Sequence, residues 1–154
     1  MSVINGYLTA RLFEIWNLRR EGWPQIDIAS KLGISRQAVN QALLEATEKV
    51  AKALTEAALI NKIEVESVNP IDGILSGWSR EFSVKAVITL TRKDGMQVWY
   101  EHAADCAHCD KFLSCQAYLF RSAVERGIKL TKEQKKLPPS RLAQILFGLT
   151  NNEQ

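Results

Sequence analysis

The stretch 36–61 contains no glycine or proline, and it constrains the fold more than any other feature of the sequence. It is rich in Ala, Leu, Glu and Lys, which favour a helix. Ser35 lies directly before it and can accept a hydrogen bond from an amide of the first turn. We therefore expect one helix over 36–61, about 39 Å long. That is long for a chain of 154 residues, which is one ordinary domain or two small ones.

Two shorter helices are predicted before the long one. In 8–21 the apolar residues fall mostly on one stripe, and Gly22 is suited to end that helix. Pro24 is suited to the first position of a second helix, because the amide that proline lacks would have no partner there. Gly33 then ends the second helix.

The pattern changes at Ile63 from that of helices to that of strands. Segments 63–68, 80–91 and 96–101 resemble strands, and residues 82–90 alternate with a period near two. Lys93-Asp94-Gly95 is suited to the turn of a hairpin. Helical features return over 110–126, and Ser140 is predicted to cap a last short helix after Pro138-Pro139.

These elements predict an α+β protein in two parts. Residues 1–62 would form a helix-turn-helix with a long dimerisation helix. Residues 63–154 would form a small antiparallel sheet of three or four strands with C-terminal helices.

Residues 25–44, QIDIASKLGISRQAVNQALL, match the requirements of a helix-turn-helix. Ala29 is small where the two helices would cross, and Gly33 tolerates a left-handed turn four residues later. Val39 and Ala42 supply apolar anchors in the second helix. The alternative is an ordinary helical hairpin, and the full pattern favours DNA binding.

The polar positions of this segment carry side chains that read and hold DNA. Arg can bind a guanine edge through two hydrogen bonds, and Asn or Gln can bind adenine. Basic and amide side chains nearby could hold phosphates. The candidate DNA-binding residues are Arg19, Arg20, Gln25, Lys31, Ser35, Arg36, Gln37, Asn40 and Gln41.

Residues 7–60 resemble the region-four and LuxR types of helix-turn-helix, and more closely the archaeal Tfx-type regulators. The shared pattern is the turn LG-S-R-x-x-V running into a long helix. The resemblance implies a transcription regulator that recognises a promoter element in double-stranded DNA. The cysteine-bearing half departs from the Tfx pattern, so the resemblance implies no particular signal.

Seven residues of the long helix recur at spacings of four and three, which is typical of a coiled-coil seam. Such a seam would make a homodimer, whose two heads could read two half-sites one helical turn apart. The alternative is that these residues pack against the chain's own first helix or sheet. They are Val39, Leu43, Ala46, Val50, Ala53, Ala57 and Ile60.

Three cysteines within ten residues point to metal or redox chemistry, because an odd, clustered set does not build a disulfide framework. His102, Cys106, Cys109 and Cys115 have the spacing H-x3-C-x2-C-x5-C. This order resembles that of a His-ligated 4Fe–4S site in some hydrogenases and respiratory dehydrogenases. The C-x2-C-x5-C part also resembles iron–sulfur nucleases, in which a distant fourth cysteine completes the set.

Three interpretations of the cluster stay open: a 4Fe–4S cluster, a structural zinc ion, or three buried or reactive thiols. Thiolate and imidazole suit zinc or iron and disfavour magnesium or calcium. The fourth ligand would be His102, with His108, solvent, a small molecule or a second chain as alternatives. We expect an iron–sulfur cluster that senses redox state, oxygen or iron. The runner-up is a DNA-binding regulator with a structural zinc site that responds to a small ligand or a protein partner.

Composition and charge narrow the classes of function. A net charge of +3 is small, and the acidic residues gather in the middle of the chain, leaving both flanks basic. No apolar run reaches the length of a membrane helix and no signal peptide is recognisable, so we expect a cytoplasmic protein with no membrane partner. No catalytic signature is found, and we expect no enzyme. The rivals are an iron–sulfur enzyme docked on DNA and a metal-stapled protein-interaction module.

Overall fold

The computed structural model describes residues 7–149, and it has the predicted α+β fold. Three helices come first: α1 Ala10–Arg20, α2 Gln25–Leu32 and α3 Arg36–Ile60. The strands β1 Ile63–Asn69, β2 Ile74–Ser79, β3 Val84–Thr91 and β4 Gly95–Tyr100 follow in one antiparallel sheet of order β1-β2-β3-β4. The last elements are the 3-10 turn η2 Cys106–His108, α4 Phe112–Glu125, α5 Lys132–Lys135 and α6 Pro139–Leu146.

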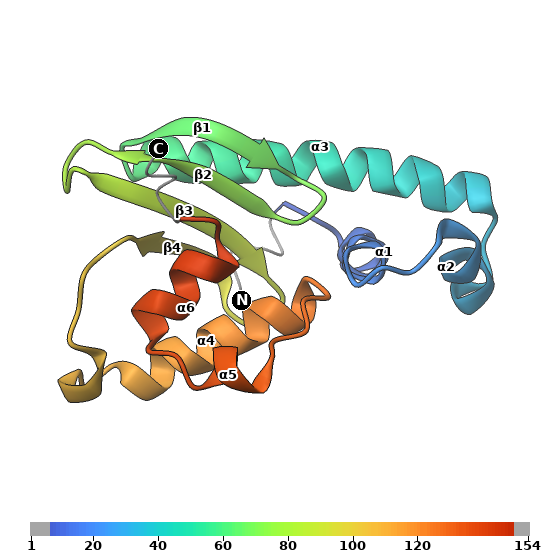
Figure 1. Cartoon of the computed structure of the whole chain (residues 1–154). Helices are drawn as coiled ribbons and strands as arrows, with labels where there is room; N and C mark the ends of the chain where they lie inside the picture. Colours follow the sequence, from blue (N-terminus) through green and yellow to red (C-terminus); the bar gives the residue numbers. More distant parts are fainter. Residues whose placement is uncertain (1–6, 150–154) are drawn as a thin grey trace, which may run out of the picture.

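The sheet lies between two helical layers. The C-terminal part of α3 covers one face, and α4 with α6 covers the other (Figure 1). The first core joins α1 and α3 to Ala86, Ile88 and Leu90 of β3. The second core joins Val87 of β3 to α4 and α6. Apolar burial on both faces of β3 therefore ties the two layers into one structure.

Both faces of β3 are buried, so the alternating residues of this strand do not separate into a solvent-exposed face and a buried face. Val87 and Thr89, which alternate with the apolar residues of the first core, are themselves buried. The Thr89 hydroxyl is hydrogen-bonded to the Tyr118 hydroxyl of α4 at 2.6 Å. A strand covered on both faces tolerates a hydroxyl when a partner satisfies it.

Most predicted boundaries are confirmed, with reasons visible in the backbone. Ser35 caps α3 by accepting a hydrogen bond from the Ala38 amide at 3.0 Å. Gly33 ends α2 in the left-handed conformation, with φ +66°. Gly95 closes the β3–β4 hairpin with φ 75°. These positions show that capping and turn residues set where the helices and the hairpin begin and end.

Three sequence predictions about the elements are wrong. Pro24 is not the first residue of the second helix, because it occupies the cap position with an extended backbone and α2 begins at Gln25. The strand expected from residue 80 begins at Val84, because 80–83 form the β2–β3 turn and Ser83 takes φ 54°. Ser140 does not cap the last helix. Pro138 occupies the cap position and α6 begins at Pro139, whose fixed φ suits the first turn.

The coiled-coil seam is also wrong, and the alternative of packing within the chain is confirmed. Val39, Leu43, Ala46, Val50 and Ala53 are buried. Val39 and Leu43 pack against α1 and α2, and Ala46 and Val50 pack in the core that α1 and the sheet of the same chain form. Ala57 packs against the first core, while Ile60 is exposed. A heptad-like spacing arises here because α3 has one continuous apolar stripe that faces its own neighbours.

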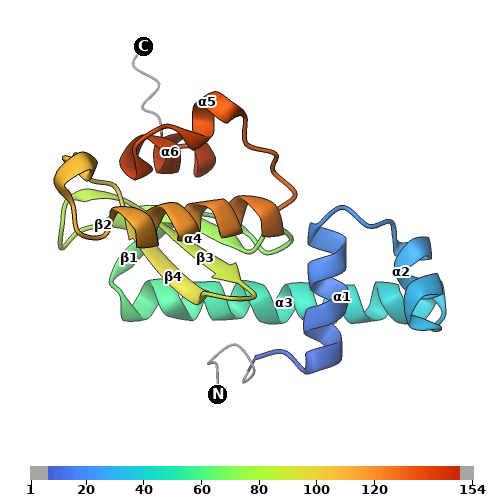
Figure 2. The same ribbon diagram turned by 90° about the horizontal axis from the view of Figure 1, so that it is seen from below.

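The molecule can be described as a head and a body. We call residues 10–44 the head and residues 45–149 the body. The head contains α1, α2 and the first turns of α3, and α1 runs across α3 at a steep angle (Figures 1 and 2). In both views α2 and the start of α3 extend beyond the sheet and the C-terminal helices. Within residues 7–149 no helix combines the length and apolar character needed to cross a membrane.

Candidate nucleic-acid interface

The head has the local geometry of a helix-turn-helix. The Ile34 amide donates to the Ala29 carbonyl at 3.1 Å across the turn after α2. A small core fixes the angle between the helices, and its buried members are Ile15, Leu18, Ile28, Ala29, Val39 and Leu43. The first two come from α1, the next two from α2 and the last two from α3, so all three helices converge on one point.

Five predicted DNA-contacting residues are exposed at the free end of α3. They are Ser35, Arg36, Gln37, Asn40 and Gln41. Val39, between them in the sequence, is fully buried. This division places the apolar side of the helix inward and its guanidinium and amide groups outward. The arrangement leaves those groups free to meet a ligand.

Three further predicted residues surround the α1–α2 connection. Arg19 and Lys31 are exposed and Gln25 is half-buried. The Arg19 guanidinium donates to the Trp23 carbonyl at 3.2 Å, and the Lys31 ammonium lies 4.8 Å from the centre of the Trp23 ring. Trp23 therefore holds both cations near the start of α2.

Arg20 lies elsewhere, and its burial excludes the predicted contact with a phosphate. It is only 5% exposed and donates to the Leu90 backbone carbonyl at 2.6 Å and to the side-chain Oδ1 of Asn17 at 2.6 Å. Its ion pair with Glu125 of α4 measures 3.0 Å. Burial lowers the pKa of Arg20, and Glu125 acts in the opposite direction. Arg20 is a structural link between head and body.

A hollow of about 510 Å³ brings three of the predicted residues together. Arg19 from α1, Gln25 from α2 and Asn40 from α3 line it, together with the exposed apolar side chains Leu44 and Ile71. Ile71 belongs to the β1–β2 turn, so the body contributes one wall. Sequence reasoning missed Leu44 and Ile71, because an isolated exposed apolar residue carries no signal until the fold places it beside others.

The three thiols lie along η2 and the first turns of α4, as their spacing predicts. Cys106 is buried, Cys109 is exposed and Cys115 is half-buried, and none forms a disulfide. The Cys106 thiol donates to the Ser140 hydroxyl at 3.3 Å. Burial is the largest cause of a raised pKa at Cys115, and the charges of Cys109 and Cys106 act in the same direction. The thiols are thus near enough to influence one another.

Each of the two histidines contacts a partner other than a thiol through its Nδ1 atom. His102 lies 2.8 Å through Nδ1 from the Tyr100 carbonyl, and its ring is tilted against Trp99. His108 is bonded through Nδ1 to Asp105 at 2.6 Å. In the part of the chain that the structure describes, no three His, Cys, Asp or Glu side chains are arranged as a metal-binding group. Side chains would have to change rotamer before a metal could take all its ligands here.

Comparison with known proteins adds no family to this geometry. No family model, curated protein or solved structure matches the chain.

Proposed function

We propose that this protein is a sequence-specific DNA-binding transcription regulator that reads double-stranded DNA with the start of α3. One observation carries the proposal: a turn of polar side chains at 35–41 is exposed at the end of a helix that extends beyond the body. The major groove admits a helix, and the end of α3 is free to enter it.

We expect two kinds of contact with DNA, one to the edges of the bases and one to the phosphates. Arg36 is placed to bind a guanine edge, and Gln37, Asn40 and Gln41 carry amides that can bind adenine. Arg19, Gln25 and Lys31 lie on the flanking α1–α2 side, where side chains contact phosphates in proteins of this architecture. Phosphate contacts would make the affinity fall with salt.

The test begins with selection of a binding site from a pool of random duplexes, followed by measurement of its Kd. Arg36→Ala and Gln37→Ala should each weaken binding to the selected site by about 1–3 kcal/mol. Stability should change little because both side chains are exposed. Arg11→Ala is the matched control, because Arg11 is exposed on α1 and, among the described residues 7–149, its ion pair is with its neighbour Glu14.

Two outcomes would contradict the proposal. The pool could yield no preferred duplex at any salt concentration, or both α3 variants could bind the selected site as tightly as Arg11→Ala does. Homodimerisation stays a prediction, and it needs a surface other than the buried seam. Sedimentation velocity at micromolar concentration, with and without the selected duplex, would measure it.

We further propose that the thiols of Cys106, Cys109 and Cys115 bind a metal, as an iron–sulfur cluster or zinc. The supporting observation is that η2 and the start of α4 gather three thiols within ten residues. The donor set suits a soft metal. His102 could supply a fourth ligand through Nε2, because its Nδ1 atom is the one that lies against the Tyr100 carbonyl.

Metal content per chain tests this second proposal. Protein purified without oxygen should contain iron with sulfide, or about one zinc per chain. Cys109→Ser should lose that metal, while Ser114→Ala, which changes an exposed hydroxyl on the same segment, should keep it. A wild-type chain without metal, or a Cys109→Ser chain with full content, would refute the site.

A further inference from the structure

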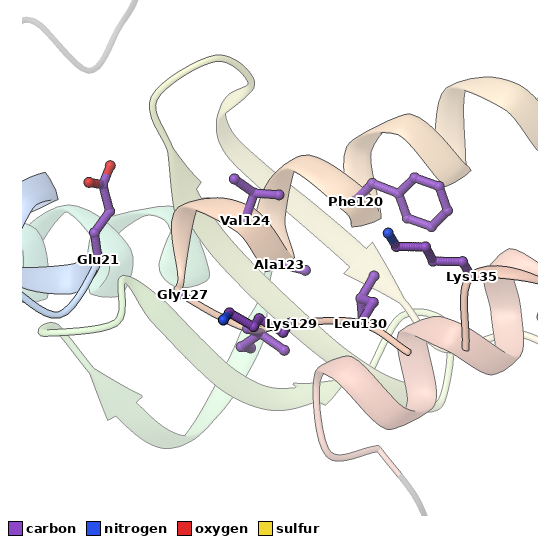
Figure 3. Close-up of a pocket in the computed structure, with 9 residues that line it drawn as sticks. Glu21, Phe120, Ala123, Val124, Gly127, Lys129, Leu130 and Lys135 are labelled. Atoms are coloured by element: carbon purple, nitrogen blue, oxygen red, sulfur yellow. The ribbon is translucent and has the colours of Figure 1, made fainter. Parts of the chain in front are cut away.

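A second cavity, of about 710 Å³, lies where the body meets the C-terminal end of α1 (Figure 3). Its size is within the range of about 300–1,000 Å³ that small-molecule sites occupy. Most of its wall is apolar and comes from α4 and the segment after it: Phe120, Ala123, Val124, Ile128 and Leu130. The charged lining residues are Lys129, Lys135 and Glu21.

An exposed apolar side chain in this wall favours a ligand. Val124 is 72% exposed although it follows the buried Ala123. Water against such a surface is displaced favourably by an apolar group. Figure 3 shows Val124, Ala123 and Leu130 between the Glu21 end of the cavity and the end that carries Phe120 and Lys135. An apolar body could therefore occupy the middle of the cavity.

The charged residues that line the cavity indicate which polar group the ligand carries. Two ammonium groups, from Lys129 and Lys135, outnumber the single carboxylate of Glu21. Figure 3 shows Lys135 beside Phe120 and Lys129 on the side of Gly127. An anion on the ligand would be attracted to either ammonium group and repelled by the Glu21 carboxylate. We propose that this cavity binds a small monocarboxylic acid with an aliphatic or aromatic body.

The cavity is in direct contact with the head. Glu21 is the residue that ends α1. Gly127, at the end of α4, lies so close to α1 that a Cβ there would be 3.5 Å from the Glu21 carbonyl and 3.8 Å from the Arg20 carbonyl. Glu125, which directly follows the lining residue Val124, forms an ion pair with Arg20. A ligand in the cavity thus touches the segment that positions α1 against α2 and α3.

This contact gives the cavity a regulatory role, and that role rests on the proposed DNA binding. A ligand that prefers one position of α1 changes the affinity for DNA, and DNA changes the ligand's affinity by the same factor. The ligand site itself depends only on the cavity and can be tested without DNA.

The first experiment titrates isotopically labelled protein with octanoate or phenylacetate and follows the backbone amide resonances. The neutral amides octanamide and phenylacetamide are the matched probes. We expect the carboxylates to shift amides at Glu21 and over 120–130, and to bind about 10-fold more tightly than the neutral probes. Lys129→Gln with Lys135→Gln should abolish that preference.

Lys132→Gln with Lys136→Gln is the control, because both lysines are exposed on the same segment and neither lines the cavity. The ligand site is refuted if neither carboxylate shifts these backbone amide resonances at millimolar concentration. It is also refuted if the carboxylate and its neutral probe bind with equal Kd, or if the control substitutions raise the Kd of the carboxylate as much as the cavity substitutions do.

A second experiment measures the Kd for the selected duplex with and without the bound acid. We expect a change of several-fold that the Lys129→Gln, Lys135→Gln protein lacks. An unchanged Kd while the acid is bound refutes the regulatory role. Failure to bind any duplex refutes the proposed function instead and leaves the amide titration valid.

Discussion

The head and the body of this molecule are stabilised in different ways. The head has one small core of six buried residues, held by a cap at Ser35 and a left-handed turn at Gly33. The body has an apolar core on each face of its sheet. The exposed side chains at the start of α3 that are candidates for DNA contact therefore lie on the region with the smaller core.

One helix belongs to both regions. Ile15 and Leu18 of α1 pack in the head, while Leu12 and Trp16 pack in the first core of the body. The Trp16 indole donates to the Pro70 carbonyl at 2.9 Å, and the Arg20 guanidinium lies 4.2 Å from the centre of the Trp16 ring. Because α1 packs in both regions, the orientation of the head relative to the body is set by α1 as well as by α3.

The largest expected loss of stability comes from breaking the link between the regions. Arg20→Ala removes the cation that pairs with Glu125 and the donor to the Leu90 carbonyl, and should cost about 3 kcal/mol because the half-buried carboxylate then keeps only the Arg92 and Lys93 backbone amides as partners. Arg19→Ala, which removes an exposed neighbour, should change stability by less than about 0.5 kcal/mol. Urea unfolding of both variants measures the difference. Equal midpoints would show that the buried ion pair does not join head and body.

A cavity in the core of the body should have the next largest effect. Leu54 is fully buried between α3 and the sheet, and Leu54→Ala should cost about 2–5 kcal/mol. Leu44 is 59% exposed on the same helix, and Leu44→Ala should cost little. Thermal and urea unfolding measure both. If the two substitutions cost the same, the packing difference along α3 is not as described.

High pH should weaken the body through Tyr118. Burial, the largest cause, raises the pKa of this phenol from 10.0 to about 12. Between these values the unfolded chain loses the proton while the folded chain keeps it, so stability is fully present below pH 10 and is lost as pH rises toward 12. The loss should be on the order of 2 kcal/mol.

Tyr118→Phe tests this pH dependence. At neutral pH the free energy of unfolding of the variant should be about 1 kcal/mol lower, because the hydrogen bond to Thr89 is missing. Above pH 10 its free energy of unfolding should decrease less steeply with pH than that of the wild type. Unfolding at a series of pH values, with phenolate absorbance as a second readout, measures both effects. Parallel pH curves for variant and wild type would contradict the assignment.

The smallest effect is expected in the head. Ser35→Ala removes the side-chain cap of α3 and should cost about 1 kcal/mol. Ser30→Ala, at an exposed position inside α2, is the control and should be nearly neutral. Unfolding measures the pair. A neutral Ser35→Ala would mean that the start of α3 is held by packing at Val39 and not by its cap.

The helices of the head were predictable because their signals are local. Ser35 and Gly33 act on their own backbone neighbours, so their effect does not depend on distant parts of the chain. The sequence pattern does not single out β2 as a strand, because Gly77 and Ser79 interrupt its apolar residues. In the structure Gly77 lies against the β1 backbone, where a Cβ would collide with the Glu64 carbonyl. That requirement exists only once the strands pair.

In the candidate site, too, some features follow from local sequence and others depend on distant residues. The exposure of Arg36, Gln37, Asn40 and Gln41 followed from their place opposite Val39 on one helix. Arg19 and Arg20 are adjacent and chemically identical, yet one is exposed and the other is buried against Glu125. Their different roles come from a partner 105 residues away in the sequence.

The sequence by itself determined the long helix, the turn before it, the α+β class and the spacing of the thiols, because these depend on propensities and distances along the chain. Only the tertiary structure decided that the stripe of α3 faces its own sheet, that Arg20 joins the two regions, and that a cavity forms beside α1. Those outcomes depend on which distant surfaces meet, and a one-dimensional pattern records that a face is apolar without recording what covers it.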